Sequence, residues 1–83
     1  MVKGTTQNGF EYEINEEVIR NIGVLDALSE LDEGNLIALP KLVKLMFSKE
    51  DKKRLYKLCS NDTEVVLKTV MEIFENNGEA KNS

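Results

Sequence analysis

The sequence predicts an α+β fold that is mostly α, with an N-terminal β-hairpin followed by three to four packed helices. Near the N-terminus, an Asn-Gly pair separates two short segments, and the second of these alternates apolar and acidic residues. The rest of the chain repeats apolar residues at helical spacing between capping residues. The chain has 83 residues, so we expect one small globular domain over residues 1–78 and a flexible polar tail over residues 79–83.

The predicted hairpin spans residues 2–14, with arms at Val2–Thr6 and Phe10–Ile14. Gln7-Asn8-Gly9 forms its turn, because Asn-Gly readily adopts the positive φ angles of tight hairpins. An isolated hairpin is marginal in water, so its apolar face should dock on the helices or on another chain. The side chains that share this face are Phe10, Tyr12 and Ile14.

A first helix is predicted over about residues 16–32, capped by Asn15 and ended by Gly34 in the left-handed conformation. Gly23 disfavours a helix interior, so the regular part of this helix is expected to begin near Asn21, a second potential cap. The buried stripe of the helix is expected to hold five residues, namely Val18, Ile22, Leu25, Leu28 and Leu31.

A second helix is predicted over residues 36–47, restarted by Asn35. Pro40 lacks an N–H group and therefore belongs in the first turn. The expected inner face is Leu39, Leu42, Val43 and Met46. The segment holds more apolar residues than a peripheral helix needs, so it is either the central helix, which we favour, or in part a partner surface. The candidates for partner contact are Leu36, Ile37, Pro40, Lys41, Lys44, Leu45 and Phe47.

Two further helices are predicted over residues 49–59 and 63–76. Ser48 opens the first with Asp51 in a variant of the capping box, and Asn61 or Asp62 opens the second. Gly78 is expected to end the last helix. Cys59 is expected to be a small core residue. The inner face of the last helix is expected to hold Val66, Val70, Ile73 and Phe74.

The composition argues against an enzyme. The chain has no histidine and one cysteine, which excludes histidine acid–base catalysis, Ser-His and Cys-His nucleophiles, nearly all zinc sites and an internal disulfide. Catalysis by a carboxylate pair remains open with 15 Asp and Glu residues, but no pair lies in a recognisable context and a chain of this size has little volume for a substrate cleft. We therefore expect no catalytic residues, no metal and no cofactor. No apolar run approaches the ~20 residues of a membrane helix, and Met1–Gly4 does not resemble the start of a signal peptide. The expected compartment is a reducing cytoplasm.

Charge is unevenly distributed along the chain. Residues 11–33 hold eight acidic groups and one basic group, a net charge of −7, whereas residues 41–57 hold seven basic and two acidic groups, a net charge of +5. The two segments either neutralise each other within the fold, which we favour, or meet between subunits or steer a protein partner.

The third predicted helix, residues 49–59, is rich in lysine and arginine, so a DNA-binding protein is an alternative interpretation. The second and third helices would form a helix-turn-helix, with Lys52, Lys53, Arg54 and Lys57 on the phosphates. The net charge of −4 argues against this interpretation, and so do Glu50 and Asp51 at the end that would enter the groove.

Four segments follow one another between about Asn8 and Leu58. They are NGFEYEI, a Leu-rich helix, LDEGNLIALPKLVKLMF and SKEDKKRLYKL. This order resembles the small tail assembly chaperones of long-tailed (siphovirus-type) bacteriophages and prophages of Gram-positive bacteria. The most specific part of this resemblance is a pattern within the third segment. It consists of an acidic residue, Gly, a polar residue, two or three apolar residues and then Leu-Pro-Lys-Leu. Gly23 departs from the bulkier or charged helix former that this family would have there.

The resemblance implies a protein that binds the tape measure protein, keeps that long helix soluble and recruits tail tube subunits. Such proteins act in the bacterial host cytoplasm and are absent from the mature virion. The chain could also form a homo-oligomer. The alternative function is a small phage or prophage regulatory protein that binds DNA or a host protein.

Many members of this family have a short form and a longer form made by programmed ribosomal frameshifting. Ala80-Lys81-Asn82 can be encoded as GCA-AAA-AAC, which contains the slippery heptamer A-AAA-AAC. The hypothesis is that this chain is the short form and that Lys81-Asn82 marks the slip site.

Overall fold

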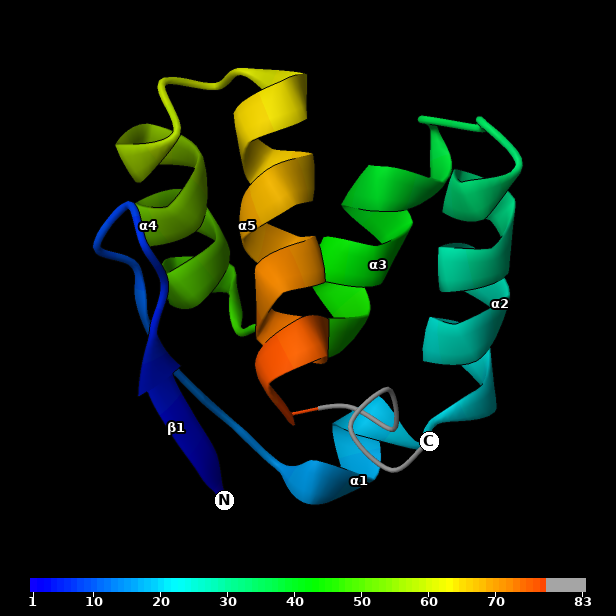
Figure 1. The fold of residues 1–83 in the computed structure, drawn as a ribbon, viewed down its shortest axis with the longest axis horizontal. Coiled ribbons are helices and arrows are strands. Elements are labelled where there is room, and N and C mark those ends of the chain that lie inside the picture. Colours follow the sequence, from blue (N-terminus) through cyan, green and yellow to red (C-terminus); the bar gives the residue numbers. More distant parts are fainter. Residues whose placement is uncertain (78–83) are drawn as a thin grey trace.

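The computed structural model describes residues 1–77, in which a two-stranded antiparallel hairpin is followed by five helices. The fold is α+β and mostly α, as the sequence predicts. Helices α3 (Ala38–Met46) and α5 (Thr63–Asn77) lie in the middle of the molecule. Helix α4 (Lys49–Leu58) and the hairpin lie to one side of them, and α2 (Ile22–Asp32) lies on the other (Figure 1). Gly78 as a helix end, the tail over 79–83 and the slip site at Lys81-Asn82 lie outside the described residues.

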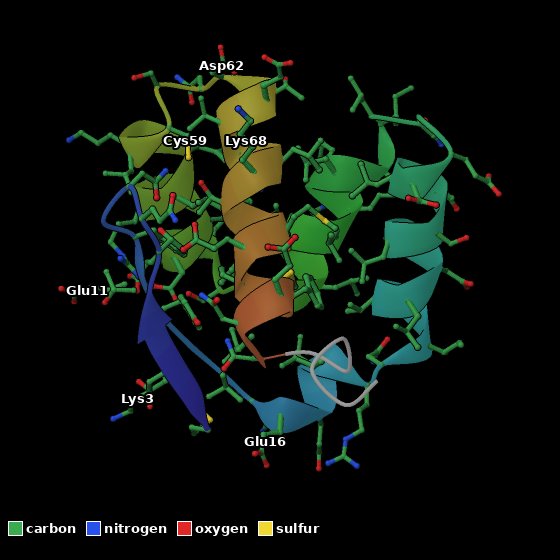
Figure 2. All side chains as sticks on the ribbon, viewed as in Figure 1. Lys3, Glu11, Glu16, Cys59, Asp62 and Lys68 are labelled. Atoms are coloured by element: carbon green, nitrogen blue, oxygen red, sulfur yellow. The ribbon has the colours of Figure 1, made fainter. Side chains whose placement is uncertain are left out.

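The hairpin forms where the sequence predicts it. Strands β1 (Val2–Thr5) and β2 (Glu11–Ile14) pair with Val2 opposite Ile14. Gly9 has a φ of 91° and donates its N–H to the Thr6 carbonyl at 2.9 Å, which closes the turn. Lys3 and Glu11 point away from the helices (Figure 2), whereas Phe10, Tyr12 and Ile14 are buried, which confirms the predicted apolar face.

The apolar face of the hairpin docks on the helices of its own chain. The rings of Phe10 and Phe47 meet edge to face, with centroids 5.6 Å apart. The guanidinium of Arg54 lies 4.7 Å from the centroid of the Phe10 ring and donates a hydrogen bond to the Glu11 carbonyl at 2.8 Å. Asn77 donates a hydrogen bond to the Tyr12 hydroxyl at 2.7 Å, which ties β2 to the end of α5.

The predicted first helix is two helices, α1 (Glu16–Ile19) and α2. Asn15 caps α1 by accepting the Glu17 N–H at 2.9 Å. Asn21 interrupts the helix because its backbone is extended, with a ψ of 131°, and its side chain accepts the Gly23 N–H at 2.7 Å. The expected restart near Asn21 is confirmed, and Gly23 lies in the first turn of α2 rather than in a helix interior.

The buried stripe predicted for this region is wrong in two places. Ile22 is 72% exposed and Leu25 is 47% exposed, whereas Val24 and Ala27 are buried. The prediction counted helical spacing from Val18 through residues 20 and 21, but the extended Asn21 resets the direction of the helix. Within α2 alone the inward spacing is regular, at Val24, Ala27, Leu28 and Leu31.

Gly34 ends α2 as predicted, with a φ of 96°. Its N–H donates to the Leu31 carbonyl and the Asn35 N–H donates to the Glu30 carbonyl, both at 2.9 Å, which is the Schellman pattern. Helix α3 begins at Ala38, four residues after Gly34, with Pro40 in its first turn. It contacts α1, α2 and α4, so it is the central helix. All four residues of its predicted inner face are buried: Leu39, Leu42, Val43 and Met46.

The caps of α4 and α5 also follow the sequence. The Ser48 hydroxyl accepts the Asp51 N–H at 3.2 Å, and Asp62 rather than Asn61 caps α5 by accepting the Val65 N–H at 3.2 Å. Cys59 is buried, and its sulfur lies 3.7 Å from the Thr69 hydroxyl, between α4 and α5 (Figure 2). Of the predicted inner face of α5, Val66, Val70 and Ile73 are buried and Phe74 is half-buried.

The turn between α4 and α5 is a helix stop without glycine. Ser60 and Asn61 have φ angles of 55° and 56°. Asn61 donates its N–H to the Tyr56 carbonyl at 2.8 Å, and Ser60 donates to the Lys57 carbonyl at 3.1 Å. This is again the Schellman pattern, with serine where glycine is usual. The turn therefore adopts a left-handed backbone that serine tolerates poorly.

Candidate functional site: an apolar groove between α3 and α4

A groove of about 520 Å³ opens between the N-terminal end of α3 and the C-terminal end of α4. Leu39 and Val66 are almost fully buried and form its floor. Leu36 and Ile37 are 50% and 75% exposed and form one rim. We call this feature the α3–α4 groove. The residues that line it are Leu36, Ile37, Leu39, Pro40, Tyr56, Asn61, Thr63 and Val66.

Two turns create the groove. The helix stop at Gly34 and the Asn35 side chain, which accepts the Ile37 N–H at 3.3 Å, place Leu36 and Ile37 just before α3 begins. The Ser60–Asn61 turn ends α4 on the opposite side. Both turns lie at the same end of the molecule (Figure 1). The exposed apolar rim is therefore positioned by the backbone hydrogen bonds of the Gly34 stop and by the Asn35 side chain.

Tyr56 is the one aromatic residue that lines the groove among the described residues. Its ring is half-buried, and burial raises the pKa of its hydroxyl. The Lys52 ammonium nitrogen lies 6.0 Å from the centroid of the ring. Tyrosine offers an apolar ring and a polar hydroxyl together, which suits it to an interface that is apolar at the centre and polar at the edge.

Leu36, Ile37 and Pro40, three of the residues predicted for partner contact, line the groove. Lys41, Lys44 and Leu45 are exposed on α3 but do not line it. Phe47 corrects the prediction, because it is only 8% exposed and packs on Phe10. The backbone becomes extended at Phe47, with a ψ of 153°, as α3 ends there.

Sequence reasoning missed the opposite wall of the groove. Tyr56, Asn61 and Thr63 come from α4, the following turn and α5, and they meet α3 only through tertiary packing. The one feature of the sequence that could have indicated this wall is Tyr56, an aromatic residue within the lysine-rich segment KEDKKRLYKL.

The two charged segments do not pair directly. Among the described residues, the ion pairs within 4.0 Å are Lys3–Glu13 at 3.9 Å and Asp51–Arg54 at 3.3 Å, and neither joins residues 11–33 to residues 41–57. Helix α2, with Asp26, Glu30 and Asp32, lies across the molecule from the basic α4, whereas the hairpin that carries Glu11 and Glu13 lies on the same side as α4 (Figure 1). Direct neutralisation, which the sequence favoured, is therefore not how these charges are arranged.

No group of three or more Cys, Asp or Glu side chains in residues 1–77 could hold a metal ion. None of the helices described has both the length and the apolar character needed to cross a bilayer. The groove instead offers an apolar floor and rim with the polar groups of Tyr56, Asn61 and Thr63 along one side.

Comparison of the chain with protein-family models, with curated proteins and with solved structures gives no match. The fold and the α3–α4 groove are therefore the basis for assigning a function.

Proposed function

We propose that this protein is a non-catalytic phage tail assembly chaperone that binds helices of the tape measure protein and helps to recruit tail tube subunits. The observation that carries this proposal is the exposed apolar α3–α4 groove. Grooves of this type bind the apolar face of an amphipathic helix through anchors at i, i+3 or i+4, and i+7. The order of motifs between Asn8 and Leu58, which resembles that family, supports the same role.

The exposed rim suits transient binding. Full burial of a Leu or Ile side chain contributes about 1.5–3 kcal/mol, and the Leu36 and Ile37 side chains are still 50% and 75% exposed before a partner binds. The loss of translational and rotational freedom on association, and the ordering of side chains, offset much of this favourable free energy. The expected affinity for one helix is on the order of micromolar, which permits release when the tail tube replaces the chaperone. In this role the protein acts in the host cytoplasm and leaves before the virion is complete.

Co-expression with a helical fragment of the tape measure protein tests the proposal. The wild-type chain should raise the soluble fraction of the fragment, and Ile37→Ser should lose this effect. Ile22→Ser is the matched control, because Ile22 is 72% exposed and does not line the groove. An unchanged soluble fraction with the wild-type chain, or equal effects of both variants, would contradict the proposal.

A DNA-binding regulator is less well supported. Of the residues proposed for phosphate contact, Arg54 is engaged by the Glu11 carbonyl, the Asp51 carboxylate and the Phe10 ring. The basic side of α4 therefore offers fewer free cations than the sequence suggests. Retention on DNA that weakens steeply with added salt would favour the regulator.

We also propose that the chain is the short form of a frameshifted pair. The support is the Ala80-Lys81-Asn82 sequence. Sequencing of the gene tests it, because codons GCG-AAG-AAT or the lack of an overlapping downstream frame would contradict it.

A further inference from the structure

We infer that the α3–α4 groove selects amphipathic helices that carry an acidic side chain one helical turn beyond their apolar anchors. This inference rests on the proposed function and adds the charge that a bound helix must present. It follows from the lysines that continue both walls of the groove.

Helices α3 and α4 run in opposite directions and are joined by the short link at Phe47 and Ser48 (Figure 1). Pro40 on α3 and Tyr56 on α4 line opposite walls of the groove. On a helix, residues four apart lie on the same face. The link lies after α3 and before α4. One turn toward it, Lys44 therefore follows Pro40 on α3, and Lys52 precedes Tyr56 on α4. The apolar groove therefore leads to a lysine on each wall.

The position of Lys52 is supported by a direct contact. Its ammonium nitrogen lies 6.0 Å from the centroid of the Tyr56 ring, so it stays on the groove side of α4. Lys44 is exposed in the last turn of α3. Lys41, one turn after Ile37, adds a third exposed cation on α3.

The acidic groups near the groove lie elsewhere. Asp62 caps α5 at the opposite end, and Glu64 follows it. In the first turn of α4, Asp51 accepts a hydrogen bond from Arg54, which itself binds the hairpin, so Asp51 faces the hairpin. Glu50 is exposed beside it. The end of the groove toward the link is therefore net basic, whereas the turn end carries charges of both signs, with Lys57 of α4 near Asp62 and Glu64.

A helix that fills the groove with apolar side chains thus meets the two lysines one turn further along. An Asp or Glu at that point gains two charge–charge contacts, whereas a Lys is repelled. The charges also set the direction of the helix, because the acidic residue must lie toward the link between α3 and α4.

Binding of three synthetic amphipathic peptides to the full chain tests this inference. The peptides share one Leu stripe and differ only one turn beyond it, with Glu, Gln or Lys. By fluorescence anisotropy at low salt, the Glu peptide should bind about tenfold more tightly than the Lys peptide, with Gln between them, and the difference should shrink as salt rises. Lys44→Glu combined with Lys52→Glu should reverse the order.

Lys3→Glu combined with Lys68→Glu is the matched control, because it changes the charge by the same amount at two exposed lysines on β1 and α5 away from the groove, so the order should persist. Thermal unfolding of each variant verifies that the fold is retained. Lys44→Gln combined with Lys52→Gln should abolish the preference for the Glu peptide over the Lys peptide. Equal affinity for all three peptides would overturn the charge selection while leaving groove binding intact. Failure of every peptide to bind would overturn both this inference and the proposed function.

Discussion

Replacement of Phe47 with alanine should destabilise the fold strongly. The Phe47 side chain is 8% exposed and meets the Phe10 ring edge to face at a centroid distance of 5.6 Å. Removal of a buried Phe side chain costs about 3–5 kcal/mol, which includes the cavity and the lost aromatic pair. A chain of 83 residues has a total stability of about 4–12 kcal/mol. Phe47→Ala should therefore remove at least a quarter of the free energy of unfolding.

Urea unfolding followed by circular dichroism measures this loss, with Ile37→Ala as the control. Ile37 is 75% exposed, so its replacement should change the free energy of unfolding by less than about 0.5 kcal/mol. In thermal unfolding, Phe47→Ala should lower Tm by roughly 17–29 °C. A double-mutant cycle with Phe10→Leu and Phe47→Leu should give a coupling of about 0.5–1.5 kcal/mol. Equal stabilities of Phe47→Ala and Ile37→Ala would refute the assignment of Phe47 to the core.

Three further changes test other parts of the structure. Ser60→Gly should raise the free energy of unfolding by about 0.5–1 kcal/mol in urea, because Ser60 has a φ of 55°; a loss of stability would contradict the left-handed turn. Gly4→Ala should lower Tm, since a Cβ at Gly4 would lie 2.7 Å from Cζ of Tyr12; an unchanged Tm would mean that the ring does not cover Gly4. Burial raises the pKa of Tyr56, so the neutral hydroxyl stabilises the fold below the unfolded pKa of about 10, and this contribution is lost as pH rises through the folded pKa. Alkaline unfolding should therefore be steeper for the wild type than for Tyr56→Phe, and identical curves would argue against the burial of Tyr56.

The sequence predicts the helix ends well because these depend on nearby hydrogen bonds. Asn15, Asn21, Ser48 and Asp62 each accept an N–H from two or three residues downstream, and Gly34 supplies the left-handed conformation that α2 needs to end. The hairpin is predictable for the same reason, since its turn and its alternating face are both local.

Features that depend on tertiary packing are not predictable in this way. Phe47 is apolar and buried, but only because the hairpin folds back to bring Phe10 against it. The second wall of the groove, including Tyr56, exists only once α4 and α5 have packed beside α3. Spacing along one helix contains none of this information.

The most direct test of the groove as the partner surface is an NMR titration of the isotope-labelled chain with the Glu peptide or a tape measure fragment. The amide signals of Leu36, Ile37 and Tyr56 should shift progressively as the groove fills, and those of Ile22 and Leu25 on α2 should stay unchanged. Shifts confined to Ile22 and Leu25, with the groove residues unaffected, would contradict the assignment of partner binding to the α3–α4 groove.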